Sequence, residues 1–196
     1  MVKPALSNIE IRWHGRGGQG VWTASNILTE AAIKEGKHAQ SFPTFGPERM
    51  GAPIMAFTRI SDEAIEVHSG IYEPDTVIVL DPTLLGAIDV LEGLKKGGML
   101  ILNYKGSNVK ELSQLVGADL RVYKTYVVSA TEIAIKTLGR GITNTAMLGA
   151  LVKAVPLVKL ETIFEVVKER FRGPIAEKNI EVIKEAYEET KEVTGE

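Results

Sequence analysis

Apolar and polar residues alternate one by one from Ile9 to His14, and apolar residues then recur every three or four positions from Val21 to about Lys34. The first pattern is typical of a β-strand with one buried face, and the second of an amphipathic helix. Gly36 follows the helical stretch, at a position where glycine commonly ends a helix. The chain therefore begins with a predicted strand, a glycine-rich turn and a predicted helix.

The next part of the chain carries strand patterns separated by a long loop. Residues 38–42 form a short predicted strand, and 43–53 hold three prolines and two glycines in eleven residues, which indicates a loop. A loop of that length in a compact domain is often functional. Residues 53–60 and 64–69 are expected to pair as a β-hairpin.

Apolar runs at 76–82 and 97–103 are typical of strands buried on both faces. A helix is expected between them over 84–94, and another strand at 120–128.

From Thr131 the pattern is helical, with predicted helices at 131–139, 144–156, 160–171 and 174–193. Thr143 or Asn144 can cap the second of these, and Pro174 suits the first turn of the last. The order of elements predicts one α/β domain over residues 1–196, with a mostly parallel sheet, one β-hairpin insertion and a helical C-terminal part.

The composition narrows the class of protein. The 23 basic residues balance 25 acidic ones without a basic block, so we expect no nucleic-acid partner. The absence of cysteine excludes thiolate zinc sites and cysteine-ligated iron–sulfur clusters on this chain. No apolar run reaches the roughly 18 residues of a membrane span, and no secretory signal is seen, so we expect a cytoplasmic protein without a membrane partner.

The glycine-rich turn contains Gly15, Gly17 and Gly20 in the spacing G-x-G-x-x-G, between the first strand and the first helix. In dinucleotide-binding folds this turn holds a pyrophosphate, and an acidic residue about twenty positions later binds the ribose. Residues 37–46 contain no Asp or Glu, which argues against NAD. Arg16 and Gln19 can instead reach a phosphate, a carboxylate or a neighbouring chain, or the glycines can form a turn without a ligand.

Glu48 and Arg49 stand in a rigid Pro/Gly frame within the long loop. This loop and the glycine turn can share the crevice at the carboxyl ends of the strands, where α/β sheets bind ligands. The alternative is a surface ion pair of little energetic value. The candidate site, for a cofactor or a subunit interface, therefore comprises Gly15, Arg16, Gly17, Gly18, Gln19, Gly20, Glu48 and Arg49.

Other chemistry-bearing residues form no recognisable active site. Asp81 ends a buried strand, where it can serve a site or cap the next helix. His14, His38 and His68 lack metal-ligand spacing and are expected to be structural or exposed. We therefore assign no catalytic and no metal-binding residue to this chain.

Three segments in this order resemble one family: HGRGGQG, then SFPTFGPERMGAPIMAFTRIS, then YEPDTVIVLDPTLL. The chain is similar over about residues 9–185 to the gamma subunit of 2-oxoacid:ferredoxin oxidoreductases, most of all the pyruvate enzyme. The resemblance implies a Rossmann-like, mostly parallel sheet with helices on both faces.

The resemblance also implies a complex with alpha, beta and delta subunits, in which partner chains bind thiamine diphosphate, Mg and the [4Fe–4S] clusters. That complex converts pyruvate, coenzyme A and oxidised ferredoxin to acetyl-CoA, CO₂ and reduced ferredoxin. This chain would be structural or would assist coenzyme A binding, and would be inactive alone. The alternatives are an independent NAD(P)-dependent oxidoreductase and a gamma subunit acting on 2-oxoglutarate or branched-chain 2-oxo acids.

Overall fold

The structure is a computed structural model that describes residues 8–44 and 50–193. Its strands are β1 (Ile9–Arg16), β2 (His38–Pro43), β3 (Pro53–Ser61), β4 (Thr76–Val79), β5 (Met99–Asn103), β6 (Lys124–Val128) and β7 (Lys191–Glu192). Its α-helices are α1 (Val21–Lys34), α2 (Val109–Val116), α3 (Ala130–Leu138), α4 (Asn144–Ala154), α5 (Leu160–Arg170) and α6 (Pro174–Glu189). Short 3₁₀ turns span Pro82–Leu84 and Leu120–Val122.

The seven strands form one sheet in the order β2-β3-β1-β4-β5-β6-β7. Strands β1, β4, β5 and β6 are parallel, whereas β3 runs antiparallel to β1, β2 antiparallel to β3, and β7 antiparallel to β6. The parallel centre places the carboxyl ends of β1 and β4 at the same edge of the sheet. The predicted α/β class with a mostly parallel sheet is confirmed.

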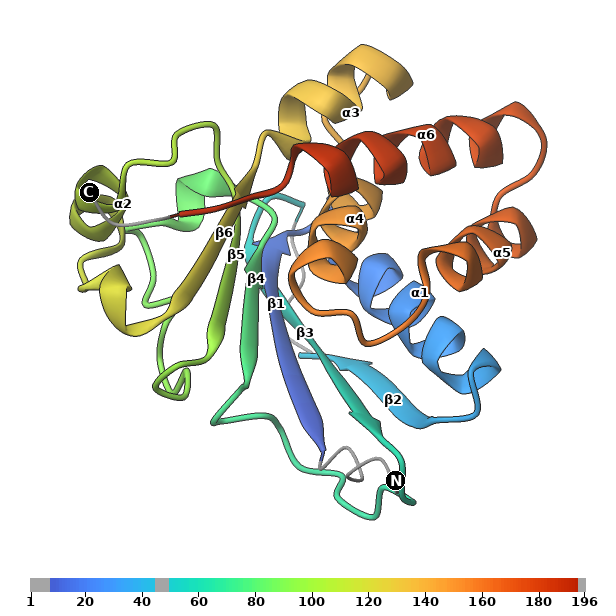
Figure 1. Cartoon of the computed structure of the whole chain (residues 1–196), viewed down its shortest axis with the longest axis horizontal. Helices are drawn as coiled ribbons and strands as arrows, with labels where there is room; N and C mark the ends of the chain where they lie inside the picture. Colours follow the sequence, from blue (N-terminus) through green and yellow to red (C-terminus); the bar gives the residue numbers. More distant parts are fainter. Residues whose placement is uncertain (1–7, 45–49, 194–196) are drawn as a thin grey trace.

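Helices cover the two faces of the sheet unequally (Figure 1). Helices α1, α3, α4, α5 and α6 pack on one face and form the larger core, while α2 lies on the other face with the second, smaller core. Strand β1 contributes to both sides, because Ile11 and Trp13 point into the larger core whereas Arg12 and His14 point to the opposite face. None of the helices in the described ranges is long and apolar enough to cross a membrane.

The hairpin prediction named the wrong partner strand. Strand β3 pairs with β2, with Phe42 opposite Phe57, and residues 64–69 form no strand. The reason is that β1 and β2 occupy both edges of β3, so no ladder position remains for a third neighbour. The segment 64–69 is held instead by side chains, since the carbonyl of Val67 accepts hydrogen bonds from Gln40 and Arg59.

The helix expected over 84–94 is also absent, because two glycines there adopt positive φ angles that a helix does not allow. Gly86 has φ 77° and Gly93 has φ 70°, and a side chain on Gly93 would collide with the carbonyl of Tyr72. The spacing of apolar residues at 84–94 arises because side chains such as Leu91 and Leu94 pack into the smaller core. Helix α2, capped by the Asn108 side chain, and strand β7 were not predicted.

The helical C-terminal part agrees with prediction. Helix α4 is buried along almost all of its length and packs closely on α6, where a side chain on Gly149 would strike the backbone carbonyl of Ile183. Pro174 begins α6 as expected, while Thr143 makes no side-chain cap.

Gly149→Ala tests this close approach. Alanine adds about 1 kcal/mol of helix propensity, yet forcing a methyl group against a backbone carbonyl costs more, so we expect the free energy of unfolding to fall by about 1–2 kcal/mol. Urea unfolding measures the change. Gly141→Ala is the matched control, because a side chain there meets only ordinary contacts with Thr131 and Ile135. Equal stabilities of the two variants would contradict the predicted collision.

Candidate functional site

The glycine turn joins β1 to α1 at the carboxyl edge of the sheet. Gly18 (φ 91°) and Gly20 (φ 74°) take the left-handed conformation that favours glycine. Gly15 and Gly20 are also close-packed, because a side chain would strike Val21 at the first position and Asn144 at the second. Gly17 bonds to the long loop, with its N–H donating to Ala52 O (2.9 Å) and its carbonyl accepting from Gly51 N (3.1 Å).

Arg16 ties the glycine turn to two neighbouring loops. Its Nη1 donates to the carbonyl of Gly51 (3.0 Å), and its Nε and Nη2 donate to Thr83 Oγ1 (3.0 and 2.9 Å). Arg16 Nε also lies 3.4 Å from Asp81 Oδ2. About a third of the side chain is exposed, at 30%. Arg16 is therefore a fixed, partly accessible cation with N–H groups left over for a further partner.

Asp81 is a buried carboxylate that contacts both Gln19 and Thr83. It accepts hydrogen bonds from Gln19 Nε2 (2.6 Å) and from the backbone and hydroxyl of Thr83 (2.9 and 2.6 Å). Burial acts to raise the pKa of Asp81, but the bonds from Thr83 and Gln19 and the charge of Arg16 together lower it below its ordinary value of 3.8. Asp81 is therefore ionised, and it both caps the Pro82–Leu84 turn and orders the glycine turn.

The Gln19 side chain bonds to both sides of the glycine turn. Its Oε1 accepts the backbone N–H of Arg16 (2.8 Å) while its Nε2 reaches Asp81. The amide thus bridges the end of β1 and the end of β4. This explains why the loop carries Gln19 where a dinucleotide-binding turn would have a small residue.

The amino terminus of α1 directly follows the glycine turn, five residues after Arg16. Ala24 N bonds to Gly20 O (3.0 Å), so the N–H groups of Val21, Trp22 and Thr23 have no partner within the helix. Within the described residues no side chain caps this end, and its first turn has no acidic residue. Free N–H groups and the positive end of the helix dipole favour an anion or a carbonyl oxygen here.

Two apolar side chains flank the same edge. Trp22, in the first turn of α1, is 51% exposed, and Met50, beside Gly18, is 93% exposed. Large exposed apolar side chains gathered beside one turn are typical of surfaces that meet another molecule.

The predicted site is brought together only in part. Gly15 to Gly20 converge with residues 50–52 of the long loop, as expected. Glu48 and Arg49 lie outside the described residues. Thr83 was missed, although a hydroxyl residue two positions after Asp81 at the end of a buried strand is a recognisable capping pattern.

The histidines are structural or exposed, as predicted. His14 is buried beside Arg12, whose Nε donates to His14 Nε2 (3.0 Å). Burial, with the Arg12 charge, lowers the pKa of His14 to about 3, so the ring is neutral. His38 and His68 are exposed, and no group of three metal-ligating side chains occurs in the described ranges.

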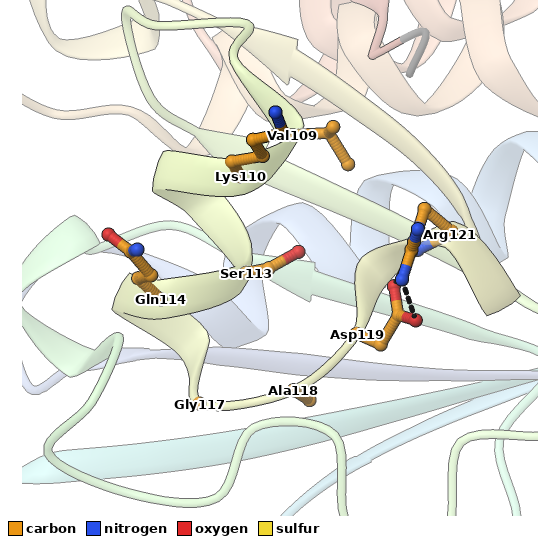
Figure 2. Close-up of a pocket in the computed structure, with 8 residues that line it drawn as sticks. All are labelled: Val109, Lys110, Ser113, Gln114, Gly117, Ala118, Asp119 and Arg121. Atoms are coloured by element: carbon orange, nitrogen blue, oxygen red, sulfur yellow. Dashed lines mark hydrogen bonds and ion pairs between the residues drawn. The ribbon is translucent and has the colours of Figure 1, made fainter. Parts of the chain in front are cut away.

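A separate hollow of about 690 Å³ lies between α2 and the Leu120–Val122 turn (Figure 2). The Ser113 hydroxyl there accepts the N–H of Leu120, and Asp119 pairs with Arg121 (2.8 Å). The Asp119 and Arg121 side chains neutralise each other, and we assign no ligand to this hollow.

Comparison with known proteins identifies the family. Residues 10–189 match the family model described as pyruvate ferredoxin/flavodoxin oxidoreductase. The pyruvate/ketoisovalerate oxidoreductases common subunit gamma of Thermococcus kodakarensis is 53% identical over 182 residues, covering 93% of this chain and 97% of that protein. The pyruvate synthase subunit PorC of Methanothermobacter thermautotrophicus is 46% identical over 185 residues, covering 94% and 97%.

The fold agrees with these relatives. The crystal structure of pyruvate oxidoreductase subunit PORC from Thermotoga maritima superposes with a TM-score of 0.84 at 41% identity, covering 95% of this chain and 99% of that one. The chain belongs to the pyruvate ferredoxin/flavodoxin oxidoreductase family, as a subunit of the gamma (PorC) type.

Proposed function

We propose that the glycine-turn edge, defined as residues 16–22, 50–52 and 81–83, helps to bind the phosphates of coenzyme A in an assembled pyruvate:ferredoxin oxidoreductase. The observation that supports this is the uncapped amino terminus of α1 next to the fixed, partly exposed guanidinium of Arg16. Backbone N–H groups and an arginine are the donors that proteins use for phosphate.

In this proposal the chain is a cytoplasmic subunit that performs no bond chemistry. The alpha, beta and delta chains supply thiamine diphosphate, Mg and the [4Fe–4S] clusters, and ferredoxin accepts the electrons. Having no cysteine, this chain cannot itself ligate such clusters through thiolates. Its own residues would hold and orient the nucleotide end of coenzyme A.

A second candidate is that the same edge docks against a neighbouring subunit. Trp22 and Met50 favour this, because both are large apolar side chains exposed beside the turn. The two candidates predict different effects of substitutions at Arg16 and Trp22 on coenzyme A binding and on assembly.

Arg16→Ala distinguishes the candidates. If Arg16 holds a phosphate, the KM for coenzyme A of the assembled enzyme should rise about tenfold, because a charge-assisted hydrogen bond contributes about 1.5–3 kcal/mol. Arg172→Ala, which removes an exposed arginine between α5 and α6, is the control and should leave that KM unchanged. An unchanged KM in an intact Arg16→Ala complex would rule out phosphate binding by Arg16.

Trp22→Ser tests the docking candidate. Loss of an aromatic anchor should weaken assembly by about tenfold or more, measured as the fraction of intact complex on dilution by native mass spectrometry. Ile33→Ser is the matched control, since Ile33 is similarly exposed (54%) near the other end of α1. Equal dilution curves for Trp22→Ser and the parent complex would contradict docking at this edge.

Asp81→Asn tests the anion that orders the turn. The neutral amide weakens the bonds from Thr83 and Gln19 and removes the ion pair with Arg16, so we expect the free energy of unfolding to fall by about 1–2 kcal/mol at pH 7. Because the folded-state pKa lies below 3.8, this stabilisation exists above about pH 4 and is lost as pH falls further through the folded value. Urea unfolding at pH 7 and pH 3 should therefore show a difference from the parent that shrinks at low pH.

Asp119→Asn is the control for Asp81→Asn. The carboxyl of Asp119 is paired with Arg121 at a site where half of its side chain is exposed (51%), so loss of its charge should change stability little. A constant difference between Asp81→Asn and the parent at both pH values would show that the carboxylate charge is not what orders the turn.

A further inference from the structure

The sheet face away from α1 carries a cleft over strands β1 and β3. It has a volume of about 800 Å³ and lies between residues 70–73 on one side and 88–93 on the other. On this half of the face the described part of the chain places irregular segments, whereas α2 packs farther along, over β4, β5 and β6. The sheet is therefore left without a helix where the cleft opens.

Two buried arginines fix the walls of this cleft. Arg59, on β3, pairs with Glu10 (2.7 Å) and donates to the carbonyls of Val67 and Gly70 (both 3.2 Å), which holds the first wall. Arg12, on β1, donates to the carbonyls of Val90 (3.2 Å) and Glu92, which holds the second wall. Because both walls are bonded to the sheet, the cleft keeps its shape when it is empty. An occupant can therefore bind with little loss of conformational entropy in this chain.

The lining of the cleft combines apolar side chains with the buried Arg12 and His14, and its rim is acidic. The apolar part of the lining consists of Met55, Phe57 and Ile71. Tyr72 also lines the cleft, and 77% of its surface is exposed. The exposed residues Glu73, Asp89 and Glu92 surround the opening.

The charge on the cleft is unbalanced. Within the described ranges none of the three rim carboxylates has an ion pair, and the lining contains a single cation, Arg12. His14, the other titratable group of the floor, is neutral. Three carboxylates against one buried guanidinium disfavour an anion and favour a positively charged occupant.

We infer that this cleft receives a segment of another chain of the complex, in which an apolar side chain fills the cleft and an adjacent Lys or Arg pairs with the acidic rim. An apolar anchor inside a ring of charge is the usual anatomy of a protein–protein contact. Membership of a family whose members are subunits of larger oxidoreductases supplies the partner chains. This surface is distinct from the glycine-turn edge and does not depend on what that edge binds.

Charge reversal tests the rim. We expect Glu73→Lys combined with Glu92→Lys to weaken assembly with the co-expressed partner chains by at least about tenfold at low salt, with a smaller effect at high salt. The matched control is Glu165→Lys with Glu188→Lys, the same charge change at exposed positions on the helical side. The melting temperature of each isolated variant verifies folding.

The proposal is overturned if the rim variant assembles as tightly as the control does, or if its loss of affinity does not depend on salt. It is also overturned if the isolated chain forms dimers that the rim variant splits, because the cleft would then receive a second copy of this chain. Since these variants leave Arg16 and Trp22 intact, either result is independent of the proposed function.

A photo-reactive amino acid in place of Tyr72 identifies the occupant. In the purified complex it should cross-link to a partner-chain peptide that carries Lys or Arg within about four residues of an apolar anchor. The same amino acid in place of Ile33, on the other sheet face, should not label that peptide. A cross-link to an acidic or uncharged segment, or no cross-link to a partner chain, would exclude the inferred contact.

Discussion

Strand β1 must be buried on both faces, and this constraint shapes the rest of the structure. It lies between β3 and β4 and is paired with a neighbouring strand along both edges. On one face Ile11 and Trp13 pack under the helices, and the indole N–H of Trp13 is satisfied by Thr58 (3.0 Å). On the other face the buried Arg12 needs acceptors, because an unpaired buried charge is strongly unfavourable. The carbonyls of residues 90 and 92 supply them, which draws an irregular segment, rather than a helix, across this face.

The same strand therefore builds two surfaces of different chemistry. At its carboxyl end the glycine turn presents backbone donors, an arginine and two exposed apolar side chains. Along its polar face it supplies the floor of a rigid, acid-rimmed cleft. Both surfaces are ordered by hydrogen bonds from buried or half-buried arginines to backbone carbonyls. Since such bonds preorganise a surface at the time of folding, each surface is suited to binding rather than to conformational switching.

The sequence predicted the elements whose signal is local. The β1–turn–α1 unit, the buried central strands and the C-terminal helices follow from periodicity, glycine and proline, and the structure confirms them. The failures depend largely on distant contacts. Pairing β3 with β2 depends on which edge remains free in the assembled sheet. The irregular path of 84–94 combines the left-handed Gly86 and Gly93 with bonds to Arg12, which lies more than seventy residues earlier. At the site, the sequence identified Arg16 and Gln19, but the bonds from Arg16 to Thr83 and from Gln19 to Asp81 required the parallel register of β1 and β4.

Two buried titratable groups near the carboxyl ends of β1 and β4, Asp81 and His14, are each held in one protonation state. A general acid or base needs a pKa near the working pH and a free position facing the reactant. Asp81 is held ionised, and its carboxylate oxygens are engaged by Thr83, Gln19 and Arg16. His14 is held neutral by burial and by Arg12, with a pKa near 3. Neither group can exchange a proton near neutral pH, so what remains at the carboxyl edge is a set of fixed donors. Such donors bind and orient a partner, and this is the physical basis for the binding role proposed for this edge.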